Sequence, residues 1–145
     1  MRYLLLLVGL MTAGLATGVQ ASGSEIEVLQ VKGTINPVLV DYLDRGITQA
    51  EESGAIACII QLDTPGGLDT SMRDIVKRMV NAKVPIVVYV SPSGARAASA
   101  GVFITMAAHI AAMAPNTAIG AAHPIAMGTE GQAELPKEME EKVAA

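Results

Sequence analysis

The chain has 145 residues, of which 51% are hydrophobic, 3% aromatic and 17% charged. That length favours one compact domain, and the hydrophobic fraction supplies enough aliphatic side chains for a core. The formal net charge is -4 and the acidic residues are spread along the sequence, which argues against a surface that binds nucleic acid.

The first 21 residues are predicted to be a secretory signal peptide. Met1-Arg2 gives a positive start, an uncharged apolar segment follows, and Val19-Gln20-Ala21 supplies a small-x-small end before Ser22. An uncleaved N-terminal membrane anchor is the alternative for the same segment. The mature protein is therefore expected to begin at Ser22 and to be exported.

A strand, a helix and a second strand are predicted next. Residues 25–33 alternate polar and apolar side chains and end in glycine, which favours a strand with one solvated face. Asn36 and Pro37 suit the N-cap and first position of a helix that continues to Gly54. Residues 55–62 are apolar on both faces, a pattern typical of a parallel strand that is covered on both sides.

A turn, a second helix and a third strand follow in the same order. Pro65, Gly66 and Gly67 indicate the turn, and the apolar residues of 68–80 mark one face of a helix. Residues 84–90 are rich in β-branched side chains and predict a buried strand. This order predicts an α/β fold with right-handed crossovers, in which ligands bind beyond the carboxyl ends of the strands.

Ser99 is the candidate nucleophile. It lies in residues 91–101, SPSGARAASAG, just after the third strand, and residues 97–110 are predicted to form an almost wholly apolar helix with Ser99 in its first turn. The unpaired N–H groups of a helix N-terminus can stabilise an oxyanion, and the Pro65-Gly66-Gly67 turn is expected to face Ser99 across one cleft. The alternative is that Ser99 only caps the helix.

Short elements are expected in the last part of the chain. The sequence predicts an apolar segment at residues 110–114, a turn at 115–117 and a short strand at 118–122. A polar loop at 127–134 and a charged helix at 135–145 follow. No cap, glycine or proline closes the charged helix. The chain is therefore interpreted as a fragment of a longer protein.

The sequence predicts no metal site and no cofactor. Cys58 is the one cysteine and lies in a predicted buried strand, where it is expected to act as a small hydrophobic residue. His109 falls within the predicted apolar helix and is expected to be buried or at an interface. The two histidines have no cysteine or paired carboxylates near them, so they do not form a zinc pattern.

Three motifs together resemble the NfeD family of membrane-bound serine proteases, which belongs to the ClpP/crotonase superfamily alongside signal peptide peptidase A. They are DTPGGL at 63–68, SPSGARAASAG at 91–101 and MAPNTAIGAAHPI at 113–125. The resemblance covers residues 24–145. It implies that residues 22–145 are the N-terminal part of a ClpP-like protease domain, with repeated β-α-β units and a mainly parallel sheet, truncated at the C-terminus.

The resemblance also implies where the protein works. The domain would lie on the extracytoplasmic face of the membrane, and its parent would be an integral membrane protein with transmembrane helices and a small β-barrel domain after the protease domain. Position by position, it implies Ser99 as the nucleophile and the N–H groups of Gly67 and Ala100 as donors to the oxyanion. A glycine presents its N–H with no side chain in the way. The expected substrate-binding residues are Gly66, Leu68, Ile119 and Gly120.

Lys142 is the predicted base. In NfeD proteases the lysine lies at the start of a helix in a Lys-Val/Ile-x-Asn setting, which Lys142-Val143 fits and Ala144-Ala145 does not. Lys137 is the second candidate, and both lysines can also be interpreted as solvated surface residues. His123 is the third, as the histidine of a Clp-type triad whose aspartate would lie further on than the chain extends. The 145-residue chain is expected to be weakly active or inactive.

The leading functional prediction is a serine endopeptidase with a Ser-Lys dyad that cleaves apolar stretches of membrane-associated proteins. The family resemblance adds the hydrophobic tail of a stomatin-like protein as substrate. Alternatives are a non-catalytic, crotonase-like peptide-binding domain, a Clp-type Ser-His-Asp protease and, less favoured in an exported protein, an acyl-CoA enzyme. Residues 97–114 are apolar nearly all round, which together with the superfamily predicts a homo-oligomer.

Overall fold

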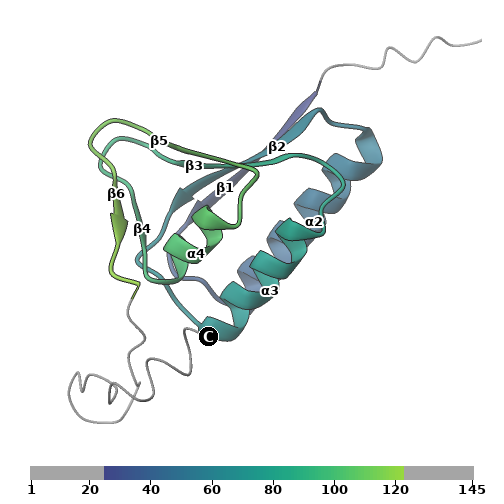
Figure 1. Cartoon of the computed structure of the whole chain (residues 1–145). Helices are drawn as coiled ribbons and strands as arrows, with labels where there is room; N and C mark the ends of the chain where they lie inside the picture. Colours follow the sequence, from purple (N-terminus) through teal and green to yellow (C-terminus); the bar gives the residue numbers. More distant parts are fainter. Residues whose placement is uncertain (1–24, 123–145) are drawn as a thin grey trace, which may run out of the picture.

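The computed structural model describes residues 25–122, and its main sheet has four parallel strands. The strands are β1 (Ile26–Lys32), β2 (Ala57–Asp63), β3 (Ile86–Val90) and β5 (Ile110–Met113), in the spatial order β1-β2-β3-β5 (Figure 1). Parallel neighbours need crossover connections, and helices supply them. The predicted α/β fold with a mainly parallel sheet is confirmed.

Two long helices form the crossovers between the first three strands. α2 (Pro37–Ser53) begins where the Asn36 side chain accepts a hydrogen bond from the Leu39 N–H at 3.0 Å, and it ends at Gly54, whose φ is 69°. Both capping residues are those that the sequence predicts. α3 (Asp69–Val80) also matches its predicted range.

The segment predicted as one helix over residues 97–110 is instead a strand, a short helix and a turn. β4 (Arg96–Ala98) pairs in parallel with β6 (Ala118–Gly120) in a second, two-stranded sheet, and α4 (Ala100–Met106) follows Ser99. Alanine favours helices by intrinsic propensity alone. Here backbone hydrogen bonds to Thr64 hold residues 96–98 extended, and these tertiary contacts override that propensity.

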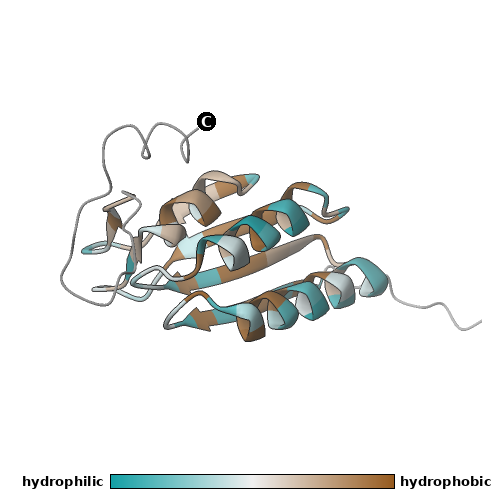
Figure 2. Cartoon of the chain, turned by 90° about the horizontal axis from the view of Figure 1, so that it is seen from below, coloured by the Kyte–Doolittle hydropathy of each residue, from teal (hydrophilic) through white to brown (hydrophobic). Residues whose placement is uncertain are grey.

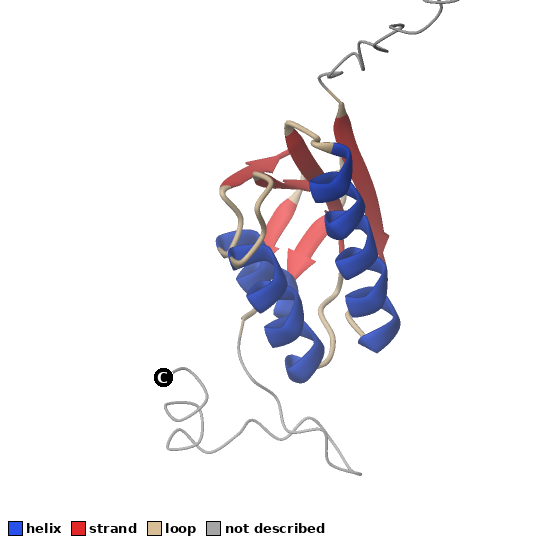
Figure 3. Cartoon of the chain, turned by 90° about the vertical axis from the view of Figure 1, so that its right-hand side faces the viewer, coloured by secondary structure: helices blue, strands red, loops and turns tan. Residues whose placement is uncertain are grey.

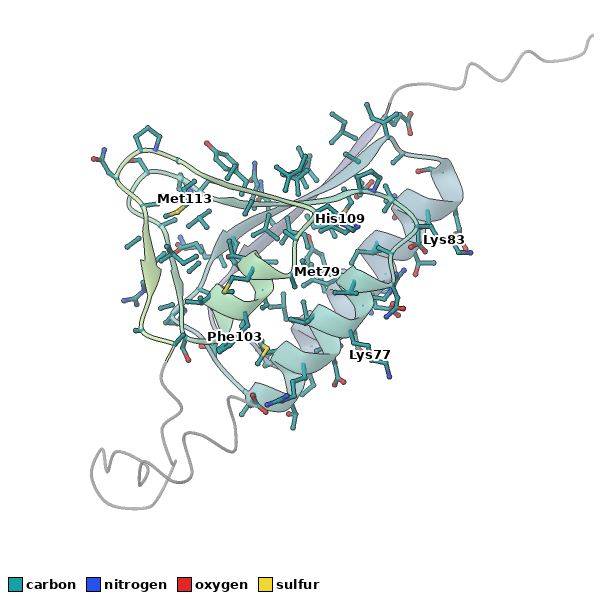
Figure 4. All side chains as sticks on the ribbon, viewed as in Figure 1. Lys77, Met79, Lys83, Phe103, His109 and Met113 are labelled. Carbon is teal, nitrogen blue, oxygen red and sulfur yellow. The ribbon has the colours of Figure 1, made fainter. Side chains whose placement is uncertain are left out.

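His109 therefore lies outside any helix. It is exposed in the turn between α4 and β5, where its Nδ1 accepts a hydrogen bond from the Ile86 N–H at 3.1 Å (Figure 4). The prediction that His109 lies within a helix is wrong because α4 ends at Met106, and the side chain is not buried; its place at an interface stays a prediction.

All three helices pack on one face of the main sheet (Figures 1 and 3). The strand side chains on that face form the core, with exposures near zero, and include Cys58, Ile60, Leu62, Ile86, Val88 and Val90. α2 and α3 turn hydrophilic residues outward, whereas α4 is mostly hydrophobic (Figure 2). No helix within residues 25–122 has both the length and the hydropathy that crossing a bilayer requires.

The opposite face of the sheet is open in the part of the chain that the structure describes. Ile59 and Val87 are partly exposed there, and Val28 and Ile110 are 45% and 58% exposed. The prediction that the second strand is covered on both sides is therefore wrong for residues 25–122. Within the described residues, the helices cover only the face of β2 that carries Cys58, Ile60 and Leu62.

Candidate active site

Ser99 occupies a strained turn between β4 and α4. Its φ and ψ are 51° and -117°, a region that costs a non-glycine residue about 1–3 kcal/mol. Surrounding hydrogen bonds hold it there, because the Ser99 N–H donates to the Gly120 carbonyl at 3.0 Å and the Ser99 carbonyl accepts from the Val102 N–H. The side chain stands at the N-cap position of α4 but makes no capping hydrogen bond. The capping interpretation is therefore wrong, and the half-buried hydroxyl is left available for chemistry.

The Pro65-Gly66-Gly67 turn lies directly against Ser99. A Cβ atom placed on Gly66 would come 2.7 Å from the Ser99 Cβ and 3.2 Å from its Oγ. Gly66 also has a φ of 110°, which side-chain-bearing residues rarely adopt. The turn and the serine, about thirty residues apart in sequence, thus lie side by side as predicted, and their sharing of one catalytic site stays a prediction.

Gly67 presents a backbone N–H that has no acceptor among residues 25–122. Its neighbours are engaged, since the Ile35 N–H donates to the Gly66 carbonyl at 2.8 Å and the Leu68 N–H donates to the Ile35 carbonyl at 3.0 Å. This parallel bridge turns the Gly67 N–H away from Ile35. Gly67 is exposed and its backbone contacts Ile35 so closely that a Cβ would overlap the Ile35 carbonyl. The Gly67 N–H can therefore reach a bound oxygen atom.

Ala100 is the first residue of α4, so its N–H has no partner within the helix. No acceptor for it lies elsewhere in residues 25–122. Ala100 and Gly67 are the residues whose N–H groups the family resemblance implies as oxyanion donors. The other expected substrate-binding residues offer either an exposed apolar side chain or a backbone group. Leu68 and Ile119 are 44% and 43% exposed apolar side chains, and Gly120 holds the Ser99 N–H through its carbonyl.

Thr64 is a site residue that the sequence motifs alone did not indicate. It is fully buried, and its hydroxyl contacts both the N–H and the carbonyl of Gly66. A signal for it was present, because Ile60, Leu62 and Thr64 alternate along one strand and its extension, and the first two face the core. That alternation places the Thr64 side chain inside.

The Cys58 thiol is not an alternative candidate nucleophile. Burial raises the pKa of the Cys58 thiol to about 11, with a smaller effect from the nearby Glu27 carboxylate. The thiol therefore stays protonated, and the predicted buried cysteine is confirmed. Within residues 25–122 no group of three or more histidine, cysteine, aspartate or glutamate side chains is placed to hold a metal ion.

The three candidate bases, Lys142, Lys137 and His123, lie outside the described residues. A hollow of about 550 Å³ lies elsewhere, on the open face of the sheet near its carboxyl edge. Its lining residues include Gln30, Gln61 and Tyr89 but neither Ser99 nor the glycines of the turn. The candidate site is therefore the contact between the turn and the serine, with its base still to be assigned.

The sequence matches one family model and two curated relatives. The model is that of the NfeD1b N-terminal domain, matched by residues 25–139. The membrane-bound protease PH1510 of Pyrococcus horikoshii is 50% identical over 100 residues, which are 69% of this chain and 23% of that protein. The membrane protein NfeD1b of Bacillus subtilis is 30% identical over 109 residues, or 75% of this chain and 24% of that protein. The chain thus spans about a quarter of the length of these relatives.

Solved structures show the same fold. The 1510-N membrane-bound stomatin-specific protease, as a serine-to-alanine mutant, aligns with a TM-score of 0.77 and 42% identity, covering 81% of this chain and 58% of that one. A lysine-to-alanine mutant in complex with a substrate peptide gives the same TM-score at 44% identity, covering 81% and 55%. A mutant of ClpP1 from Listeria monocytogenes aligns with a TM-score of 0.62 and 22% identity, covering 81% and 63%, and shows the ClpP-like fold alone.

Proposed function

Because the chain belongs to the NfeD1b N-terminal domain family, we propose that residues 25–122 carry the nucleophile and the oxyanion donors of a membrane-associated serine protease. The observation that carries this proposal is the contact between Gly66 and Ser99. This contact places a strained serine, whose hydroxyl makes no capping hydrogen bond, beside the turn in which the next residue, Gly67, has an N–H without an acceptor among residues 25–122. A nucleophile with a nearby backbone donor is the arrangement that acyl transfer requires.

In the proposed reaction, the Ser99 Oγ attacks the carbonyl carbon of a peptide bond and its proton passes to the neutral amine of Lys142. The oxyanion that forms accepts hydrogen bonds from the Gly67 and Ala100 N–H groups, each worth about 10²- to 10³-fold in rate. The C–N bond then breaks, and the leaving amine takes the proton back from the lysine. Water hydrolyses the acyl-enzyme with the same lysine as base.

We propose an apolar peptide segment as the substrate. Leu68 adjoins the proposed oxyanion donor and Ile119 lies on the strand next to β4, and both side chains are more than 40% exposed. The solved relatives are described as stomatin-specific, and one of them holds a substrate peptide. A hydrophobic segment of a stomatin-like membrane protein is therefore the substrate to try first.

Labelling of the complete natural protein with a fluorophosphonate probe tests the proposal, because such probes react preferentially with activated serines. We expect mass spectrometry to find the label on Ser99 and Ser99→Ala to abolish it. Ser93→Ala is the matched control, since Ser93 is an exposed serine in the preceding loop and should leave labelling unchanged. Binding of an apolar peptide without any labelling would instead favour the non-catalytic peptide-binding domain.

We also propose that residues 1–21 are a cleaved leader, that 22–145 begin the protease domain, and that the protein works on the extracytoplasmic side of a membrane. Two relatives are named as membrane proteins, which supports an association with a membrane but does not specify the side. N-terminal sequencing of protein expressed with its natural leader should read from Ser22. An intact Met1 in the membrane fraction would indicate an anchor.

A further inference from the structure

We infer that Thr64 is a positioning residue, which fixes the separation between the oxyanion glycine and the nucleophile. The inference rests on the proposed function. Thr64 is 0% exposed, and its hydroxyl makes two hydrogen bonds to one residue. The Oγ1 accepts from the Gly66 N–H at 3.0 Å and donates to the Gly66 carbonyl at 3.2 Å.

The backbone of Thr64 holds the other half of the site. Its N–H donates to the Arg96 carbonyl at 2.7 Å, and its carbonyl accepts from the Ala98 N–H at 3.1 Å. These two bonds hold β4, the strand that ends directly before Ser99. The Thr64 Cγ2 also lies against Gly101, where a Cβ would come within 2.6 Å of it. Thr64 thus contacts the residues on both sides of Ser99.

Thr64 is the link between the turn and the serine within the described part of the chain. No hydrogen bond there joins residues 65–67 directly to residues 98–100. The contact between Gly66 and Ser99 is one of packing, and packing fixes a distance only if both backbones are held. Thr64 holds the backbone of Gly66 through its side chain and the backbone of β4 through its main chain.

Removing the Thr64 hydroxyl should free Gly66 without unfolding the turn. The Gly66 carbonyl keeps its bond from the Ile35 N–H, whereas the Gly66 N–H loses its acceptor. Glycine has wide conformational freedom, so residues 66 and 67 can then shift against Ser99. A displacement of about 1 Å at a reacting centre can cost about 10²-fold in rate.

Two variants in the complete natural protein separate positioning from stability. Thr64→Val keeps the shape and the Cγ2 contact but removes the hydroxyl, so we expect kcat on an apolar peptide to fall about 10²-fold with KM within about twofold. Thr64→Ser keeps the hydroxyl but loses the methyl group against Gly101. We expect it to retain kcat within about threefold although its Tm falls. A residue that only stabilises the fold is not expected to give this pattern, in which Thr64→Val lowers kcat without changing KM and Thr64→Ser restores kcat.

Thr105→Val is the matched control. Thr105 is also buried, and its hydroxyl donates one hydrogen bond to the Gly101 carbonyl inside α4, away from the turn. We expect its kcat to stay within about twofold of the natural protein. An equal loss in Thr105→Val and Thr64→Val would mean that removing any buried hydroxyl nearby lowers activity, and would overturn the inference.

The remaining outcomes are also decisive. If Thr64→Val cleaves and labels like the natural protein, Thr64 does not position the site although the proposed function stands. If Thr64→Val fails to fold, Thr64→Ser decides, because a kcat that falls in step with its Tm overturns the inference and an unchanged kcat at lowered Tm supports it. If the natural protein neither labels nor cleaves, the proposed function fails and the inference fails with it.

Discussion

Gly66 and Gly67 exclude side chains for different reasons, and this difference can be tested. At Gly66 an added Cβ would meet the Ser99 side chain, so Gly66→Ala should displace the nucleophile. At Gly67 the obstacle is the Ile35 carbonyl, so Gly67→Ala should break the bridge that orients the proposed oxyanion donor. We expect the rate of fluorophosphonate labelling to fall at least about 10²-fold in both variants.

Gly94→Ala is the control for backbone strain alone. Gly94 has a φ of 87°, but a Cβ there would have no atom within 4 Å. The substitution should cost about 1 kcal/mol of stability and leave labelling unchanged. Labelling of Gly66→Ala at the natural rate would show that the packing of the turn on Ser99 is not part of the active arrangement.

The sequence predicts which residues lie at the candidate site better than it predicts their backbone conformations. Glycines after one buried strand and a serine after the next indicate a shared site, because parallel strands end at the same edge. The φ of Ser99 could not be predicted, since it depends on Gly120 and Thr64 holding the chain on either side. Thr64 was missed because a threonine between Asp63 and Pro65 is typical of any turn.

Among the elements, the helices with clear termini were predicted to the residue or nearly so. Asn36, Pro37 and Gly54 carry local signals, and α2 begins and ends where they indicate. The segment around Ser99 has no such signals. Its alanines favour a helix, whereas tertiary hydrogen bonds and pairing with β6 make a strand of Arg96–Ala98. Non-local contacts of this kind are not readable from propensity.

An ion cluster joins α2 and α3 and makes their packing sensitive to acid. The Arg78 side chain pairs with Asp44 at 2.6 Å and Glu51 at 3.0 Å, and Glu51 also accepts from the Lys83 N–H at 2.8 Å. The hydrogen bond from Arg78, followed by that from Lys83, lowers the pKa of the Glu51 carboxyl below its ordinary value of 4.5. Because the pKa of Glu51 is lower in the folded than in the unfolded protein, the ionised carboxylate stabilises the fold at a pH above the unfolded-state pKa. This stabilisation is lost as the pH falls through the folded-state pKa.

Glu51→Gln should therefore destabilise the protein by about 1–2 kcal/mol at pH 7. The difference from the natural protein should shrink as the pH falls below 4.5, where Glu51 itself becomes protonated. Urea unfolding at several pH values measures the effect, and Glu52→Gln, on the exposed side of the same helix, is the control. A difference that is the same at pH 7 and at low pH would contradict the assignment.

At the scale of the whole molecule, apolar side chains remain exposed around α4 and β5. The helix and the segment after it expose 43% of Phe103, 75% of Met106, 58% of Ile110 and 43% of Met113, two of which Figure 4 labels. Exposed apolar side chains on a helix and on the strand at the edge of the sheet are typical of an interface. It supports the predicted homo-oligomer, which remains a proposal.

Light scattering on the mature protein should therefore report a dimer or larger species. Met106→Lys should lower the average mass, because it places a charge on the proposed interface. Val38→Lys is its matched control, since Val38 is also 75% exposed but lies on α2, away from α4. A monomeric natural protein, or equal effects of the two lysine substitutions, would refute this interface.

The assignment of Lys142 as the base depends on the rest of the protein more than on the site itself. A lysine accepts a proton near neutral pH only when burial disfavours its ammonium form, because its unperturbed pKa is about 10.4. The relatives are about four times as long as the matched segment, so the residues that bury the lysine are expected beyond position 145. The 145-residue chain alone should cleave weakly or not at all, and the complete natural protein should cleave.

In that complete protein, Lys142→Ala should abolish turnover about as fully as Ser99→Ala, because two residues that act as one unit give equal losses. Lys137→Ala and His123→Ala should each leave substantial activity, and they serve as controls for the loss of a nearby cation and of the alternative base. Initial rates on one apolar peptide measure all four variants. The reverse result, an inactive His123→Ala beside an active Lys142→Ala, would replace the dyad with a Clp-type triad, since the histidine would then be the group that takes the Ser99 proton.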